Sequence, residues 1–233
     1  MATNVYKTLL KIVGVVLALI GIGAMIGGNF ASGFVKDQLK AQQITMPDAS
    51  KQPTEAQGGD FTQADVDALK PFSNTQLDSG PKAKAYADNY IAVHMRSAAK
   101  AAGVPEDKQT FAGIGEYINE TYAPKLTDEI KADQPNLSDD EVKALVKSEP
   151  NNKDTKYEAA KTIGKLDALR TNSFFEGNML RGTLLSAYGW GLIGTIAIIA
   201  AWVLIVLGVL LFVAGFVIKG KKAPVVEKTT IQE

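Results

Sequence analysis

Two long apolar segments, one toward each end of the chain, constrain the fold more than any other feature of the sequence. Residues 12–30 contain no charged side chain, and residues 184–218 contain none over a longer stretch. A helix of about 20 apolar residues crosses the roughly 30 Å of hydrocarbon in a bilayer. The sequence therefore predicts two transmembrane helices, over residues 9–30 and residues 189–218.

Each apolar segment has another interpretation. The first resembles the apolar core of a cleaved signal peptide, and the second resembles a buried core helix. The first run is longer than the apolar region of a usual signal peptide, and no small-residue cleavage site of the A-x-A type follows it. The second run exceeds what a bilayer requires. We therefore expect both segments to be membrane spans.

Lysines flank both predicted spans on the side of the chain termini. They are Lys7, Lys11, Lys219, Lys221 and Lys222. Short flanks rich in Lys and Arg stay in the cytoplasm, whereas long loops cross the membrane largely regardless of charge. We expect residues 1–8 and 219–233 to be cytoplasmic tails in the cell membrane, and residues 31–188 to form an extracytoplasmic domain.

The distribution of charge argues against nucleic-acid binding. Residues 30–188 contain 19 Lys and Arg against 23 Asp and Glu, a net charge of −4, and the two ends carry a net charge of +4. A basic stripe of the kind that binds nucleic acid is not apparent. The chain also has no cysteine, which excludes disulfides and thiolate metal sites.

Small residues recur every seven positions in both apolar segments. The first segment has Gly14, Gly21 and Gly28, and the second has Ala187, Gly194, Ala201, Gly208 and Gly215. A seven-residue repeat keeps one stripe of a helix facing its partner. Small side chains on that stripe let two backbones approach closely within lipid. The repeats predict that the two spans pack antiparallel along these stripes.

A second small-residue pattern lies on another face of the first span. Gly23 and Gly27 form a GxxxG motif, which is typical of helix association in membranes. The motif predicts a contact with a second partner helix. The alternative is that glycine is simply frequent in membrane helices.

The central segment is predicted to be helical, with Pro- and Gly-containing turns between the helices. The expected helices cover residues 34–43, 62–70, 82–102, 110–122 and 127–133, a helix capped by Ser138 and Glu141, and a last helix from about residue 155 that continues into the second span. The predicted fold class is mainly α. Two antiparallel transmembrane helices extend into a helical stalk that carries a small extracytoplasmic helical domain.

The sequence contains no motif that predicts catalysis or metal binding. His94 is the only histidine, whereas zinc and iron sites normally need two or three His or Cys ligands. Residues 139–141 are acidic but lack the alternating ligands of a calcium loop, and they fit the first turn of a helix. The predicted spans contain no Asp, Glu, His or Arg, unlike most transporters and channels. We expect no catalytic, cofactor-binding or metal residues and a protein that is not an enzyme.

Three stretches of this sequence resemble a family of small two-span membrane proteins from actinobacteria. They are VKDQLKAQQITMPDA at residues 35–49, LDSGP at residues 77–81, and LRGTLLSAYGWG at residues 180–191. Residues 104–165 look like an insertion relative to shorter members. Some members carry the label of an aromatic ring-opening dioxygenase. Such enzymes hold iron with two His and a carboxylate, and this chain has a single His.

The resemblance also points to accessory subunits of the actinobacterial cytochrome bcc–oxidase respiratory supercomplex. It implies a non-enzymatic accessory or structural subunit, with membrane lipids and integral membrane proteins as partners and no cofactor. The alternative is an envelope module that binds or senses a ligand or lipid in a pocket between the outer helices. Phe111, Tyr117 and Phe174 are candidates to line such a pocket, although core packing is their more common use.

Overall fold

The computed structural model describes residues 2–218, which divide into two units. The first unit contains residues 2–34 and 190–218, and the second contains residues 35–189. The predicted tail at residues 219–233 lies outside the described residues. Within the described part of the chain no β-strand forms, and extended backbone pairs only at isolated bridges. The prediction of a mainly helical protein is confirmed.

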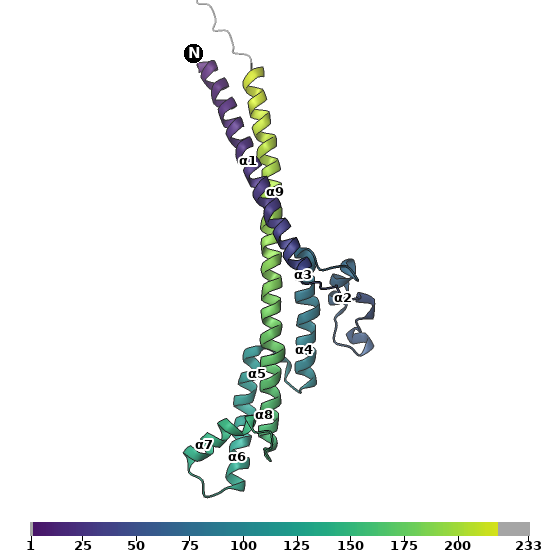
Figure 1. The fold of residues 1–233 in the computed structure, drawn as a ribbon, viewed down its shortest axis with the longest axis vertical. Helices are drawn as coiled ribbons and strands as arrows, with labels where there is room; N and C mark the ends of the chain where they lie inside the picture. Colours follow the sequence, from purple (N-terminus) through teal and green to yellow (C-terminus); the bar gives the residue numbers. More distant parts are fainter. Residues whose placement is uncertain (1, 219–233) are drawn as a thin grey trace, which may run out of the picture. The chain divides into compact units, whose positions relative to one another are not determined.

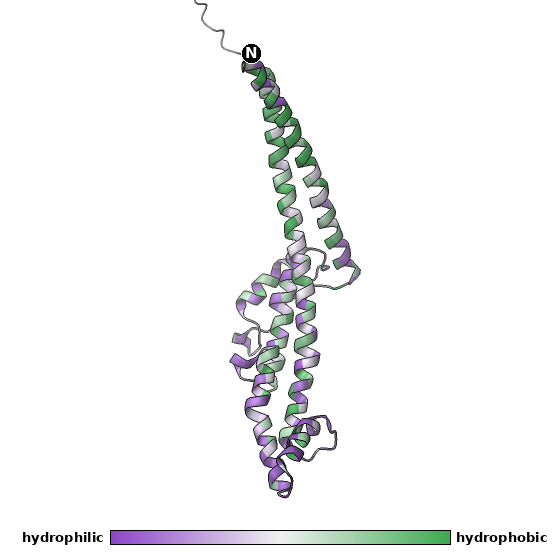
Figure 2. Ribbon diagram, turned by 90° about the vertical axis from the view of Figure 1, so that its left-hand side faces the viewer, coloured by the Kyte–Doolittle hydropathy of each residue, from purple (hydrophilic) through white to green (hydrophobic). Residues whose placement is uncertain are grey.

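The first unit is built from two long helices that lie side by side (Figure 1). Helix α1 covers Ala2–Ala41 and α9 covers Glu176–Val217, so each helix also supplies residues to the second unit. Both helices are long and apolar enough to cross a membrane, and only 11% of the most apolar window of each is buried within the protein. Figure 2 shows mostly hydrophobic residues along both helices in this unit. Their outward faces therefore expose apolar side chains.

The second unit contains short helices joined by single turns. The α-helices are α2 (Gln63–Leu69), α3 (Gly80–Tyr86), α4 (Ala92–Ala101), α5 (Phe111–Tyr117), α6 (Ala123–Asp133), α7 (Asp139–Ser148) and α8 (Glu158–Ala168). The 3₁₀ turns are η1 (Ala49–Lys51), η2 (Glu55–Gln57), η3 (Lys70–Phe72), η5 (Glu106–Lys108) and η7 (Glu149–Asn151).

Side-chain caps explain where several of these helices begin. The Ser138 hydroxyl accepts a hydrogen bond from the Glu141 backbone N–H, and the Glu141 carboxylate accepts one from the Ser138 N–H at 2.8 Å. Thr62 and Asp65 form the same reciprocal box before α2. Such boxes satisfy backbone donors that have no partner within the first helical turn. Both starts were predicted from the sequence.

Three π-helical segments interrupt helices that the sequence predicts to be regular. Segment η4 (Ala87–Ile91) joins α3 to α4, η6 (Ile118–Tyr122) joins α5 to α6, and η8 (Leu169–Phe175) joins α8 to α9. A π turn inserts an extra residue and rotates the helical face that follows. The inserted residue shifts the apolar pattern by one position, and in helices this short the shift is not distinguishable from ordinary irregular spacing.

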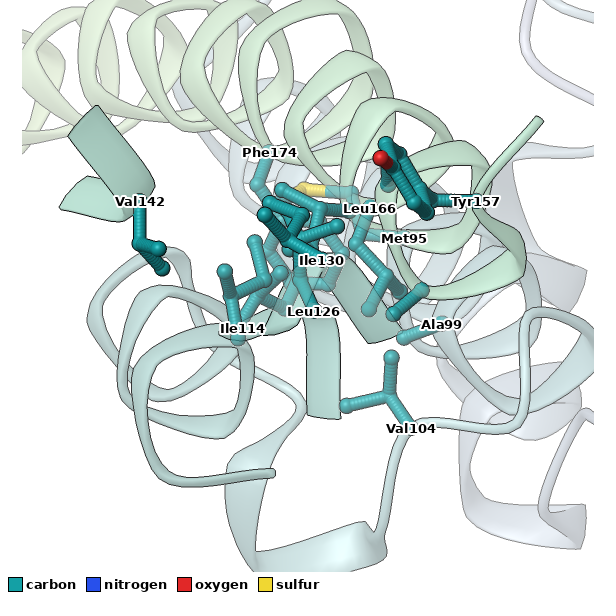
Figure 3. Packing of buried hydrophobic residues seen from close by; sticks show 14 residues of the cluster. Met95, Ala99, Val104, Ile114, Leu126, Ile130, Val142, Tyr157, Leu166 and Phe174 are labelled. Atoms are coloured by element: carbon teal, nitrogen blue, oxygen red, sulfur yellow. The ribbon is translucent and has the colours of Figure 1, made fainter. Parts of the chain in front are cut away.

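Two hydrophobic cores hold the second unit together, and α4 contributes to both. One core gathers side chains from α4 to α8 and η8, including Met95, Leu126 and Phe174 (Figure 3). The other gathers side chains from the end of α1, the residues that follow it, α2, α3 and the start of α9. Val93 belongs to this second core although it lies only two positions from Met95. Since residues two apart point to different sides of a helix, α4 can pack against both cores.

Asp60 ties the segment before α2 to α4. Its carboxylate accepts a hydrogen bond from the Ser97 hydroxyl at 2.5 Å and from the Lys100 ammonium at 2.9 Å. The hydrogen bond from Lys100 is the main cause that lowers the pKa of Asp60 below its usual value, and the bond from Ser97 acts in the same direction. A carboxyl group with a lowered pKa in the folded protein stabilises the fold while it is ionised.

The hydrogen bonds that Asp60 accepts from Ser97 and Lys100 predict a specific dependence of stability on pH. Because its pKa is lower in the folded than in the unfolded chain, the stabilisation is fully present above the unfolded pKa, near 4. It is lost as the pH falls through the folded pKa. The measurement is the thermal unfolding midpoint in detergent, followed by circular dichroism. When the pH is lowered from neutral to acid, we expect this midpoint to fall less for Asp60→Asn than for the parent protein. Asp107→Asn, at an exposed residue of η5, is the control and should follow the parent curve. If Asp60→Asn also follows that curve, this explanation is wrong.

Candidate functional site

The α1–α9 contact brings together the small residues that the sequence analysis singled out. A methyl group on Gly14 would lie 2.5 Å from the carbonyl oxygen of Gly208. A methyl group on Gly208 would lie 2.6 Å from the carbonyl oxygen of Gly14 and 2.8 Å from the backbone nitrogen of Ala18. Real Cβ atoms essentially never approach other atoms so closely. The two backbones can therefore lie this near each other only when both residues are glycine.

The same relationship recurs along both helices. A methyl group on Gly28 would lie 2.8 Å from the carbonyl oxygen of Gly194, and one on Gly21 would lie 2.9 Å from that of Ala201. Ala201 itself is fully buried. A methyl group on Gly215 would lie 2.9 Å from the carbonyl oxygen of Lys7. The contact thus passes through small residues from one end of the unit to the other.

Gly23 and Gly27 lie outside this contact. An added methyl group at either glycine would meet no atom within 4 Å in the described part of the chain. Ala187, the first member of the predicted repeat on α9, also lies outside the contact. It belongs to the second unit and packs against the core that contains Leu184. The paired stripe on α9 therefore begins at Gly194.

Several contact residues escaped the sequence analysis, among them Ser32, Ala18 and Ile205. A methyl group on Gly194 would lie 2.6 Å from the Ser32 hydroxyl oxygen, and Ala18 and Ile205 pack against Gly208 and Gly21. Ser32 and Ala18 each follow a stripe glycine by four positions. Because residues four apart share a helical face, that spacing was the signal that would have identified them.

The chemistry of the contact is that of packing. Apart from the Ser32 hydroxyl, the named contacts are made by apolar side chains and backbone. A small hollow of about 200 Å³ beside Gly14 and Gly208 is lined by side chains that include Val15, Leu19 and Phe212. The ammonium group of Lys11 lies over the ring of Phe216, 3.5 Å from its centroid. Such a cation–π pair suits the end of an apolar helix pair, since it gives the charge a partner without a carboxylate.

The polar candidates of the sequence analysis do not converge. His94 is exposed on α4, with its ring edge-on to Tyr90 at 4.4 Å and to Phe61 at 5.6 Å between centroids. The acidic residues 139–141 form the first turn of α7, as predicted. Within residues 2–218, no group of three His, Asp or Glu side chains is placed to hold a metal ion.

The aromatic residues proposed to line a pocket are divided by the structure. Phe111 and Phe174 line one hollow in the second unit, together with Met95. Tyr117 does not line it, and its ring lies edge-on to that of Tyr122 at 5.4 Å between centroids. Phe174 is a member of the core that contains Met95, and Phe111 and Tyr117 both pack against that core.

Comparisons of the chain with protein-family models, with curated proteins and with solved structures find no match. The resemblance to small actinobacterial membrane proteins therefore stays a prediction.

Substitution of Gly208 tests the contact directly. Gly208→Leu places a large side chain where even a methyl group would meet backbone atoms, so the helices must separate or shift. We expect the change to destabilise the helix pair by about 1–3 kcal/mol or more, the range typical of overpacking. The measurement is the thermal unfolding midpoint of the full-length protein in mild detergent.

Gly23→Leu is the matched control, because it makes the same chemical change at an open position of α1. It should leave the unfolding midpoint of the isolated protein unchanged or slightly raised, since leucine favours helix more than glycine does. Equal unfolding midpoints for Gly208→Leu and Gly23→Leu would show that the contact contributes nothing to stability.

Proposed function

We propose that this chain is a two-pass membrane protein with both tails in the cytoplasm and its central domain outside. Two long apolar helices with exposed apolar faces support the spans. The lysines that flank the apolar segments support the orientation, because positive flanks stay in the cytoplasm. In this proposal the spans run antiparallel. The order of the contacts supports that direction, since Gly14 meets Gly208 whereas Gly28 meets Gly194.

We further propose that the protein acts as a non-enzymatic accessory or structural subunit of a larger membrane complex. The observation that carries this proposal is the division of small residues on α1 between two faces. One face is occupied by α9, whereas Gly23 and Gly27 have open space around them. Close packing against a GxxxG face is a common means of helix association in lipid. The neighbouring side chains Ile20 and Ile26 are exposed and apolar, so a partner helix would meet a continuous apolar surface.

The specific candidate for the complex is the actinobacterial cytochrome bcc–oxidase supercomplex. The support for it is the sequence resemblance at residues 35–49, 77–81 and 180–191. The partners would be membrane lipids and integral membrane subunits of that complex.

The topology predicts a defined pattern of proteolysis. A protease added outside spheroplasts should cut only within residues 31–188 and should leave a C-terminal tag attached to a membrane-protected fragment. The reason is that the bilayer shields whatever lies on its cytoplasmic side. The fragments are read by immunoblot, with detergent-permeabilised spheroplasts as the control in which the tag is lost. Loss of the tag from intact spheroplasts would place the C-terminus outside and overturn the orientation.

Recovery of partners tests the accessory role. We expect a C-terminally tagged protein, purified in mild detergent, to bring with it stoichiometric cytochrome subunits, detected by mass spectrometry and by a haem spectrum. Gly23→Leu combined with Gly27→Leu should reduce that recovery several-fold, because large side chains would block close packing on the open face. Gly33→Leu is the matched control, since it changes another helical glycine of α1 with open space around it.

The outcomes separate two parts of the proposal. In one outcome, the parent protein recovers membrane proteins other than cytochrome subunits, and the double variant recovers fewer of them. That result would support the accessory role and reject the respiratory complex as the partner. Recovery that is the same for the double variant and for Gly33→Leu would reject the open glycine face as the contact.

A further inference from the structure

Two of the chain's three arginines line one hollow in the second unit, and the third contacts a residue that lines it. The chain has 25 basic side chains, and only Arg96, Arg170 and Arg181 are arginines. Arg96 on α4 and Arg181 on α9 both line a hollow of about 190 Å³. Arg170 in η8 lies over the ring of Phe111, 4.4 Å from its centroid, and Phe111 lines the same hollow. The positions come from helices far apart in the sequence, so the fold alone unites them.

The hollow is lined by both apolar and polar side chains. Its apolar residues include Met95, Phe111 and Phe174, of which Phe111 is partly exposed and the other two are core residues. Its polar residues include Asn178 and Thr110 beside the two arginines. The Thr110 hydroxyl accepts a hydrogen bond from the Gly113 backbone N–H at 2.9 Å, which leaves its own proton free to be donated. Small-molecule sites are commonly lined by apolar side chains together with a few polar groups of this kind.

Arg181 is held in a fixed orientation by protein groups. Its Nε donates to the carbonyl oxygen of Ala87 at 3.0 Å, and its Nη2 donates to the Asp88 carboxylate at 3.1 Å. Those bonds leave Nη1 to donate to another acceptor. A guanidinium held in this way loses little side-chain freedom when it binds a ligand.

Arg96 supplies a second guanidinium. Within residues 2–218, no carboxylate forms an ion pair with Arg96, and no side-chain hydrogen bond involves it. It also borders a larger neighbouring hollow of about 700 Å³, where Glu55, Asp60 and Glu106 are the acidic residues. The smaller hollow, in contrast, is lined by two arginines and by no Asp or Glu. Asp88 already pairs with Arg181, so Arg96 supplies the positive charge at the smaller hollow that no carboxylate balances, and that charge favours an anion there.

We propose that the smaller hollow is a binding site for a small molecule that carries one oxyanion, a carboxylate or a phosphate, on a compact apolar body. Guanidinium groups bind both oxyanions through charge-assisted, often bidentate hydrogen bonds. Arg181 and Arg96 hold the oxyanion, and the apolar body lies against the partly exposed ring of Phe111. The site is independent of the helix contacts that support the accessory role, so either can exist without the other.

The test is isothermal titration of the full-length protein in mild detergent with benzoate and with phenyl phosphate. Both probes carry a ring and one oxyanion, and phenol serves as the uncharged ring. We expect saturable binding of at least one anion and none of phenol. Tighter binding of benzoate identifies a carboxylate site, and tighter binding of phenyl phosphate identifies a phosphate site. Saturable binding of neither anion at millimolar concentrations overturns the proposal.

Substitution at Arg96 shows whether the binding uses this hollow. Arg96 is exposed, so its replacement should leave the fold intact. We expect Arg96→Gln to weaken anion binding by about tenfold or more, the loss that follows removal of a hydrogen bond to a charged group. Arg96→Lys should bind with intermediate affinity, because an ammonium keeps the charge but lacks the planar fork. Lys147→Gln, at an exposed residue of α7, removes one positive charge elsewhere and should not change the affinity. Equal affinity for Arg96→Gln and the parent protein overturns the proposal.

Discussion

The close approach of α1 to α9 depends on missing side chains. At Gly14 and Gly208 each helix presents bare backbone to the other, and a single methyl group on either residue would meet the opposite carbonyl oxygen. Dispersion attraction falls steeply with distance, so helices that approach this closely gain contacts that bulkier residues would prevent. In the proposed membrane location no hydrophobic force would drive the helices together, so this packing would be the principal attraction available.

The same constraint explains why α1 can serve two purposes. A helix presents several faces, and the stripe that meets α9 occupies one of them. The residues Gly23 and Gly27 lie on a different face, which the described part of the chain leaves uncovered. Gly14 and its stripe would thus hold the protein together, and the GxxxG face would hold it to a neighbour. A proposed accessory subunit needs both properties in the same helix.

In the second unit, polar side chains that belong to the proposed anion site lie beside the apolar cores. The helix α4 supplies Val93 to one core and Met95 to the other, so α4 lies between the two cores. Arg96 follows Met95 directly and borders both hollows. At η4 the Ala87 carbonyl accepts a hydrogen bond from Arg181, which joins a π-helical turn to α9. π turns are often found at functional sites, and this one positions a residue of the proposed anion site.

Much of the helical architecture could be predicted from the sequence, because its signals are local. A long run without charge predicts an apolar helix, the Ser138 and Glu141 pair predicts a helix start, and the glycines at seven-residue spacing predict a contact stripe. Each of these depends on residues within a few turns of one another. The π-helical segments were not predicted, since the one-residue shift that each causes is not distinguishable from irregular apolar spacing in short helices. Ala187 was assigned to the stripe by its spacing alone, whereas packing places it in a core of the second unit.

What the sequence determined by itself was therefore the helical class, the two apolar segments and which faces of them carry small residues. Only the tertiary structure decided that the contact stripe on α9 begins at Gly194, and that Arg96 and Arg181 line one hollow together with Phe111, whose ring lies under Arg170. The reason is physical. Helix formation and amphipathicity follow from neighbours along the chain, but the meeting of α4, η8 and α9 depends on the packing of side chains that lie up to 85 positions apart in sequence, from Arg96 to Arg181.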